Sequence, residues 1–168
     1  MLKPLKAVTV AVLLCLGTGW AQQPTVLSAA DAQKLVPQNY FYAGQTAPVQ
    51  ARNSAVAKSP GGKFVLAGMV DVSGYSSALA EKYQAFLITE GPLQVGGKPL
   101  GTGAYGIGTL ANGDFIVTDL GGTTLFSVPL HADADLKRPV PLTMTVAGDS
   151  LRLYLGKKYV ELRFGSGK

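Results

Sequence analysis

Residues 142–164 constrain the fold most, because apolar and polar residues alternate there through three short runs. In the runs 142–146, 151–155 and 159–164, every second residue is apolar. A period of two is that of a β-strand that buries one face. Gly148-Asp149 and Gly156 separate the runs with turn-forming residues. The pattern predicts a three-stranded antiparallel meander with one buried face.

The lengths of the turns predict the register of this meander. A two-residue turn at Gly148-Asp149 pairs Leu142 with Leu155, and a four-residue loop over 156–159 pairs Leu155 with Val160. Every apolar residue then lies opposite another apolar residue. A slip of one residue would expose the whole set, so the face that is buried is strongly specified.

The same register places Arg152 directly opposite Arg163, an arrangement in which like charges repel each other. Glu161, diagonal to Arg152, or Tyr154, packed over the guanidinium, would offset the repulsion. The functional alternative is that Arg152 and Arg163 form a face that binds an anion or an acidic partner in the envelope.

The strands upstream of this meander are indicated by repeated turn signals of the kind that separate the short strands of an all-β fold. The signals are Pro60-Gly61-Gly62, Gly96-Gly97, Asn112-Gly113 and Gly121-Gly122. We therefore predict an all-β fold, an antiparallel β-sandwich or flattened barrel of about 8 to 10 strands with a short N-terminal helix.

That helix is predicted over residues 28–36. Ser28 followed by Asp31 resembles a capping box, and Pro37 ends the helix. A further helical turn is compatible with residues 72–82. Residues 22–38 then form a lead segment with the short helix, and residues 39–168 form a single β-rich domain, as this length favours.

The pair Asn112-Gly113 predicts a hairpin with a type I′ turn, because the pair supplies positive φ angles at little steric cost. This turn pairs Leu110 with Phe115 and leaves Gly106 and Gly108 on one face. The result is a strip almost without side chains. Such glycines mark bulges, sharp coiling, or a place where another chain or a ligand comes close.

Residues 1–21 have the pattern of a secretory signal peptide. A positively charged N-terminal segment with two lysines precedes an apolar run over 7–16. Gly19 and Ala21 provide the small residues at positions −3 and −1 of a cleavage site before Gln22. The apolar run is too short to span a bilayer, which takes about 20 residues. We expect a mature protein of about 147 residues that is soluble in the periplasm or outside the cell.

Composition excludes several kinds of site. Cys15 leaves with the signal peptide, and the bulky residues before it argue against a lipid anchor. No cysteine remains, which excludes disulfides and cysteine-bound metals. The net charge of +5 falls to +3 on cleavage, without a basic run dense enough for nucleic acid. The chain lacks serine-hydrolase, zinc-peptidase and phosphate-loop motifs, so we predict no cofactor.

Charged side chains offer two further candidate sites, a metal site and an acid–base pair. His131 is followed by Asp133 and Asp135, but the series lacks the longer ligand run of a calcium loop, so we predict a solvated loop and no metal. Asp71 and Asp119 lie within apolar strand sequence and are expected to be partly buried. We interpret both as structural residues at strand ends; the alternative is an acid–base pair.

Tyrosines are the better candidates for a binding site, since the ring offers an apolar face and the hydroxyl a polar group. Alternation places Tyr40 and Tyr42 on the side of a strand opposite Phe41, which we expect in the core. The candidate ligand-binding residues are Tyr42, Tyr75, Tyr83, Tyr105 and Asp119.

Two segments resemble uncharacterised exported bacterial proteins with a β-rich domain. They are residues 39–44, Asn-Tyr-Phe-Tyr-Ala-Gly, and residues 100–122, which include Tyr-Gly-Ile-Gly at 105–108 and Asp-Leu-Gly-Gly at 119–122. The resemblance implies a β-rich fold and brings no established activity or functional residue.

These observations favour an exported, non-catalytic protein that binds a small ligand, a glycan or a protein partner through its tyrosine-bearing sheet. One alternative is a structural component of the envelope that assembles through an exposed strand edge. A second alternative is an enzyme with a carboxylate–tyrosine site.

Overall fold

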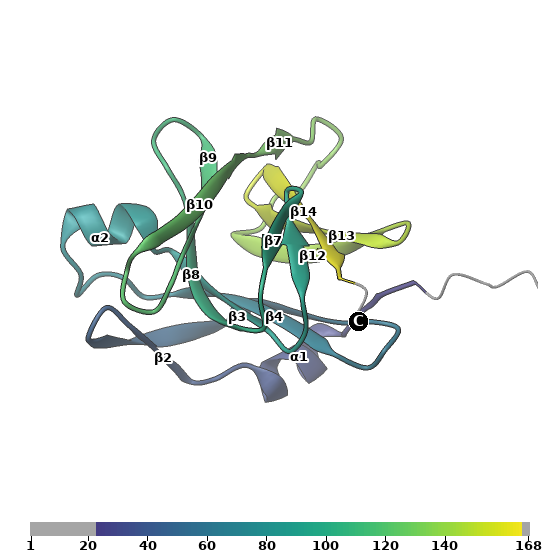
Figure 1. The fold of residues 1–168 in the computed structure, drawn as a ribbon, viewed down its shortest axis with the longest axis horizontal. Coiled ribbons are helices and arrows are strands. Elements are labelled where there is room, and N and C mark those ends of the chain that lie inside the picture. The colour runs from purple at the N-terminus through teal and green to yellow at the C-terminus, as the bar shows by residue number, and fades with distance from the viewer. Residues whose placement is uncertain (1–22, 166–168) are drawn as a thin grey trace, which may run out of the picture.

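The computed structural model describes residues 23–165, and two antiparallel sheets of eight and six strands make up most of this part (Figure 1). The sheets are not closed into a barrel and form a β-sandwich, which confirms the predicted all-β class. The number of strands exceeds the prediction because several strands have only two or three residues. Strands this short have too few residues to show the apolar–polar alternation from which strands are predicted.

The larger sheet is built mainly from the first two thirds of the chain. Its order is β1 (Thr25–Val26), β3 (Gln45–Lys58), β4 (Phe64–Val70), β5 (Ala85–Thr89), β8 (Gly103–Thr109), β9 (Asp114–Thr118) and β10 (Thr124–Pro129). The eighth strand, β2 (Asn39–Tyr42), pairs with the first residues of β3.

The smaller sheet contains the predicted meander. Its order is β12 (Leu142–Ala147), β13 (Ser150–Leu155), β14 (Lys158–Phe164), β6 (Leu93–Val95) and β7 (Lys98–Leu100), and β11 (His131–Ala132) also pairs with β14. The chain crosses from the larger to the smaller sheet between β5 and β6. It returns between β7 and β8, and crosses again between β10 and β11.

Both predicted helical segments are confirmed. α1 (Ala29–Leu35) begins after Ser28, whose side-chain oxygen accepts a hydrogen bond from the backbone N–H of Asp31 at 3.2 Å. α2 (Ser77–Lys82) occupies the segment where a helical turn was expected. In α1, Ala32 is buried and Leu35 is 46% exposed, so this helix packs through a narrow face.

The register of the meander is predicted correctly at its first turn and wrongly at its second. Leu142 pairs with Leu155 as expected. Between β13 and β14, however, Leu155 pairs with Lys158 and Leu153 with Val160. Gly156 adopts a φ of +63°, which allows a two-residue turn in place of the expected four-residue loop. The shift is by two residues, so the same face stays buried.

The β8–β9 hairpin also differs from the prediction, by one residue. Thr109 pairs with Phe115, and the N–H of Gly113 donates to the carbonyl of Leu110 at 2.8 Å. Gly113 has a φ of +91°, but Asn112 has no positive φ. A three-residue loop with one left-handed glycine therefore replaces the expected type I′ turn.

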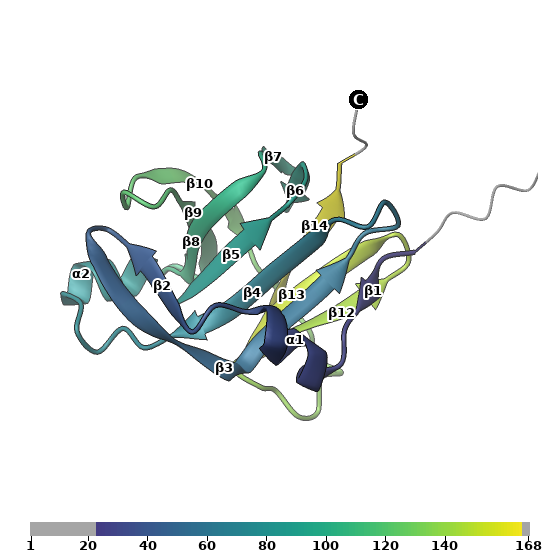
Figure 2. The ribbon, with the colours of Figure 1, turned by 90° about the horizontal axis from the view of Figure 1, so that it is seen from below.

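Two hydrophobic cores flank the larger sheet. The main core lies between the sheets and includes Leu87, Ile107 and Phe115 from the larger sheet with Leu151 and Leu153 from the smaller one. A second core lies on the outer face of the larger sheet, under β2 and α1 (Figure 2). Strands β4 and β5 are buried on both faces, which explains their continuous apolar sequence.

Candidate functional site

Three of the four candidate tyrosines come together in the second core. The rings of Tyr42 and Tyr83 are stacked with centroids 3.9 Å apart, and Tyr75 meets Tyr83 edge-on at 5.6 Å. Tyr42 and Tyr83 have no exposed surface. A ligand could therefore reach them only after β2 and its neighbours moved, and their assignment as ligand-binding residues stays a prediction.

Hydrogen bonds tie this cluster to the larger sheet. Thr118 Oγ1 donates to the carbonyl of Gly106 at 3.2 Å, so its single hydrogen is used and the hydroxyl of Tyr42 donates to Thr118 Oγ1 at 2.6 Å. The hydroxyl of Tyr83 is buried without a hydrogen-bond partner among residues 23–165. Burial raises the pKa of Tyr42 and of Tyr83 above the ordinary value of 10.0.

The remaining aromatic predictions have mixed outcomes. Tyr40 and Tyr42 lie on the opposite side of β2 from Phe41, as expected, but that side is the buried one. Phe41 is 55% exposed, so its expected place in the core is wrong. Tyr105 stands apart from the stacked rings; its hydroxyl donates to the carbonyl of Gly101 at 3.0 Å.

The strip of glycines on β8 is a place of close approach between segments of this chain. A Cβ atom on Gly106 would lie 2.4 Å from the ring of Tyr42, and one on Gly108 would lie 2.8 Å from the carbonyl oxygen of Lys82. These glycines therefore make room for β2 and for the end of α2. The sequence suggested the close approach of another chain or a ligand, whereas the neighbours in the structure are segments of this chain.

The two candidate carboxylates stabilise turns. Asp119 Oδ1 accepts from the N–H of Thr123 at 2.8 Å, and Asp71 Oδ1 accepts from the N–H of Ser73 at 3.0 Å. Asp119 is half-buried, but Asp71 is exposed, so the expectation that both are partly buried is wrong for Asp71. Turn formation favours the structural interpretation of both residues over an acid–base pair.

The corrected register changes the surroundings of Arg152. This residue lies opposite Glu161, so the predicted pairing with Arg163 is wrong. Its guanidinium stacks on Tyr159 at 4.5 Å and lies 3.8 Å from a carboxylate oxygen of Asp133. The side chain of Arg163 pairs with Glu161. The repulsion that suggested an anion-binding face is therefore absent, and the binding of an anion or acidic partner at Arg152 and Arg163 stays a prediction.

Asp133 has a structural partner in the same cluster. The hydroxyl of Tyr154 donates to Asp133 Oδ2 at 2.7 Å and, as the largest cause, lowers the pKa of this carboxyl. Among residues 23–165, no three side chains of the histidine, cysteine, aspartate or glutamate types gather closely enough to hold a metal ion.

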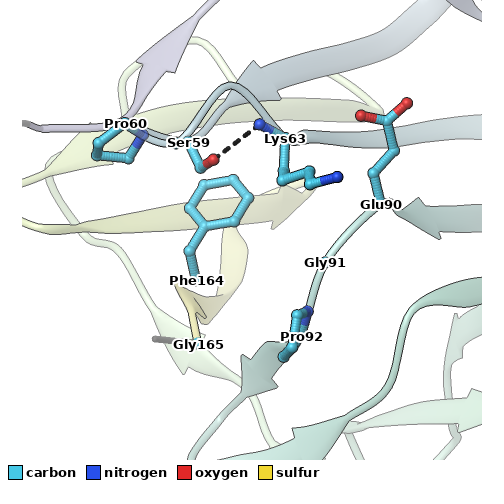
Figure 3. Close-up of a pocket in the computed structure, with 9 residues that line it drawn as sticks. Ser59, Pro60, Lys63, Glu90, Gly91, Pro92, Phe164 and Gly165 are labelled. Atoms are coloured by element: carbon cyan, nitrogen blue, oxygen red, sulfur yellow. Dashed lines mark hydrogen bonds between the residues drawn. The ribbon is translucent and has the colours of Figure 1, made fainter. Parts of the chain in front are cut away.

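A cleft that the sequence did not indicate lies where the chain crosses from one sheet to the other. Its volume is about 510 Å³, within the usual range for small-molecule sites. The walls are the β3–β4 turn, the β5–β6 connection and the end of β14 (Figure 3). They comprise Ser59, Pro60, Gly61, Lys63, Glu90, Gly91, Pro92, Phe164 and Gly165.

Hydrogen bonds to backbone N–H groups hold the walls of this cleft in place. Ser59 Oγ accepts from the N–H of Lys63 at 2.9 Å, which fixes the β3–β4 turn. The N–H of Gly165 donates to the carbonyl of Pro92 at 2.8 Å and joins the end of β14 to the β5–β6 connection. Glu90 Oε2 accepts from the backbone N–H of Phe64 at 2.9 Å. The cleft is therefore largely preformed.

The side chains of the cleft combine an apolar floor with two charges. The half-buried ring of Phe164 points into the space between the turn that carries Pro60 and the connection that carries Pro92 (Figure 3). Lys63 and Glu90 are exposed at the rim. Such a floor with a few polar groups is typical of sites that bind small molecules.

Two smaller hollows adjoin each other on the smaller sheet. Their volumes are about 240 and 250 Å³, and both are lined by Gly97 and Glu161. These volumes fall below the usual range for ligand sites, which makes the larger cleft the stronger candidate.

The sequence carries a signal for two of the three walls, but none for the contact among the walls. Pro60-Gly61-Gly62 marks a turn, and alternation directs Phe164 inwards. The contact among the three walls, however, depends on the crossing of the chain between sheets, which no local pattern encodes.

Comparisons with protein-family models, with curated proteins and with solved structures find no match to this chain. The resemblance to uncharacterised exported bacterial proteins therefore stays a prediction. Within residues 23–165, neither helix has the length and hydropathy needed to cross a membrane.

Proposed function

We propose that this protein is an exported, non-catalytic binding protein that holds a small ligand in the cleft between the β3–β4 turn and the end of β14. The observation that carries the proposal is the cleft itself. It has the volume of a ligand site, hydrogen-bonded walls, an aromatic floor at Phe164 and two charged residues at the rim.

Export is part of the proposal, and the position of the first strand is compatible with it. The predicted cleavage before Gln22 falls outside the described residues, and β1 begins at Thr25. Cleavage there would leave every described element of the fold in place. The released chain would act in the periplasm or outside the cell.

The two alternatives from the sequence have less support. Assembly through a strand edge would use a strand such as β10, but this strand has a register shift between Thr124 and Phe126 and ends at Pro129. Irregularities and proline at an edge discourage pairing with another chain. An enzyme with a carboxylate–tyrosine site would use Asp71 or Asp119, and both carboxylates hold turns.

The proposal is tested by a thermal-shift screen of a small-molecule library against the exported protein. Ligands of the cleft raise the melting temperature, because binding to the folded state alone stabilises it. The decisive variant is Phe164→Leu, which keeps an apolar side chain but removes the ring. Phe41→Leu, at an exposed position on β2, is the matched control. Phe41→Leu should leave the shifts unchanged; if Phe164→Leu also kept them, the cleft would be the wrong site.

A further inference from the structure

The rim of the cleft carries one charge of each sign. Within residues 23–165, neither Lys63 nor Glu90 takes part in a salt bridge. One oxygen of Glu90 accepts from the N–H of Phe64, which orients the carboxylate and leaves its other oxygen for a ligand. The ammonium of Lys63 supplies donors. An anion or a cation would be attracted by one of these two residues and repelled by the other, so the rim gives a singly charged ligand no advantage over a neutral one.

Neutral ligands differ in what they offer these two residues. An acyl chain lying on Phe164 would give neither charged group a hydrogen-bond partner. Hydroxyl groups both donate and accept, so neighbouring hydroxyls can serve the carboxylate of Glu90 and the ammonium of Lys63 together. The rim therefore favours a compound with several hydroxyl groups.

The apolar surfaces of the cleft are flat. The ring of Phe164 forms the floor, and the rings of Pro60 and Pro92 stand on either side of it (Figure 3). A pyranose ring presents C–H groups on its faces and hydroxyls around its edge. Such a ring can lie on Phe164 while its hydroxyls reach the two charged residues.

From these features we infer that the ligand of the cleft is a neutral carbohydrate, a mono- or short oligosaccharide. This inference rests on the proposed function and adds the chemical class of the ligand. Phe164 supports the face of the sugar ring, Glu90 accepts from its hydroxyls, and Lys63 donates to them.

The test is a titration followed by NMR, with ¹⁵N-labelled protein produced from the full sequence and purified after export. The neutral probes are methyl β-glucopyranoside, N-acetylglucosamine and cellobiose. The other probes are glucuronate, glucosamine, the dipeptide Gly-Phe and decanoate. We expect a neutral sugar to shift backbone signals of the β3–β4 turn and of residues 90–92, and to bind at least fivefold more tightly than any charged, zwitterionic or acyl probe.

Single substitutions at Glu90, Lys63 and Phe164 identify the groups that hold the sugar. Glu90→Gln and Lys63→Gln each weaken the binding of that sugar by at least threefold, and Phe164→Leu weakens it by at least fivefold. Lys98→Gln, at an exposed position on β7, is the control and leaves the affinity unchanged.

The possible failures are distinguishable. If no neutral sugar shifts the signals of the cleft while compounds from the small-molecule screen do, the carbohydrate inference is overturned and the binding function stands. Tighter binding of Gly-Phe or decanoate than of any neutral sugar overturns the inference in the same way. If neither sugars nor screened compounds bind, the inference and the proposed function fall together.

Discussion

Tyr42 and Tyr83 lie face to face with ring centroids 3.9 Å apart, yet only one of the two hydroxyls has a hydrogen-bond partner. Tyr42 donates to Thr118, whereas the hydroxyl of Tyr83 is buried without a partner among the described residues. The two rings therefore contribute similar packing, and their hydroxyls make opposite contributions to stability.

Replacing each tyrosine by phenylalanine should show this difference. Tyr42→Phe removes a hydrogen bond and should lower the free energy of unfolding by about 1 kcal/mol. Tyr83→Phe removes a buried polar group without a partner and should raise it by about 1 kcal/mol. Urea denaturation of the two variants measures both changes. An equal loss of stability in both would contradict the finding that only the hydroxyl of Tyr42 has a hydrogen-bond partner.

The stability of the protein should fall as the pH rises above about 10, the ordinary pKa of tyrosine. Burial raises the pKa of Tyr40, Tyr42 and Tyr83 in the folded state. A raised folded-state pKa means that the unfolded chain releases protons that the folded chain retains, so the stability present below pH 10 is lost above it. Phenolate absorbance should show these tyrosines ionising only together with unfolding, not before it.

Gly106 should tolerate no side chain. A Cβ atom there would meet Tyr42 at 2.4 Å and Thr118 at 2.6 Å, both inside a packed core. Gly106→Ala should cost about 2 to 3 kcal/mol of stability through overpacking. Gly74→Ala, where nothing lies within 4 Å, is the control and should change the stability by less than about 0.5 kcal/mol. Similar melting temperatures for both variants would contradict the role given to Gly106.

Export should remove residues 1–21 and leave Gln22 as the first residue. Signal peptidases require small residues at the positions that Gly19 and Ala21 occupy. Ala21→Arg should therefore block cleavage, whereas Cys15→Ser should leave export and processing unchanged. N-terminal sequencing and mass spectrometry of the exported chain check this; a lipid-modified chain that begins at Cys15 would show the prediction to be mistaken.

The sequence predicts the fold well where a local pattern determines structure. Alternation in residues 142–164 specifies three strands and their buried face, and Ser28 and Pro37 delimit the helix. The pattern does not specify loop length, because the two- and four-residue loops at Gly156 bury the same face. It also does not show which side of β2 is buried, because β4, β5 and the segment that follows α2 complete the second core from distant positions in the chain.

The candidate site was less predictable because its residues, like those of the second core, come from separate parts of the chain. Lys63, Glu90 and Phe164 come from three separate segments, and only the crossing of the chain between the sheets brings them together. The tyrosines were conspicuous in the sequence because they are large and clustered. In the structure, these rings pack against one another, and Tyr42 also packs against Gly106 of β8.

The central claim, that the cleft binds a ligand, is tested most directly by locating bound compounds on the protein. Compounds that raise the melting temperature should be titrated into ¹⁵N-labelled protein, and the shifted backbone signals assigned. The largest shifts should fall on residues 59–63, 90–92 and 164–165. Shifts centred on Tyr42, Tyr75 and Tyr83, with the cleft unaffected, would contradict it and return the binding site to the tyrosine cluster.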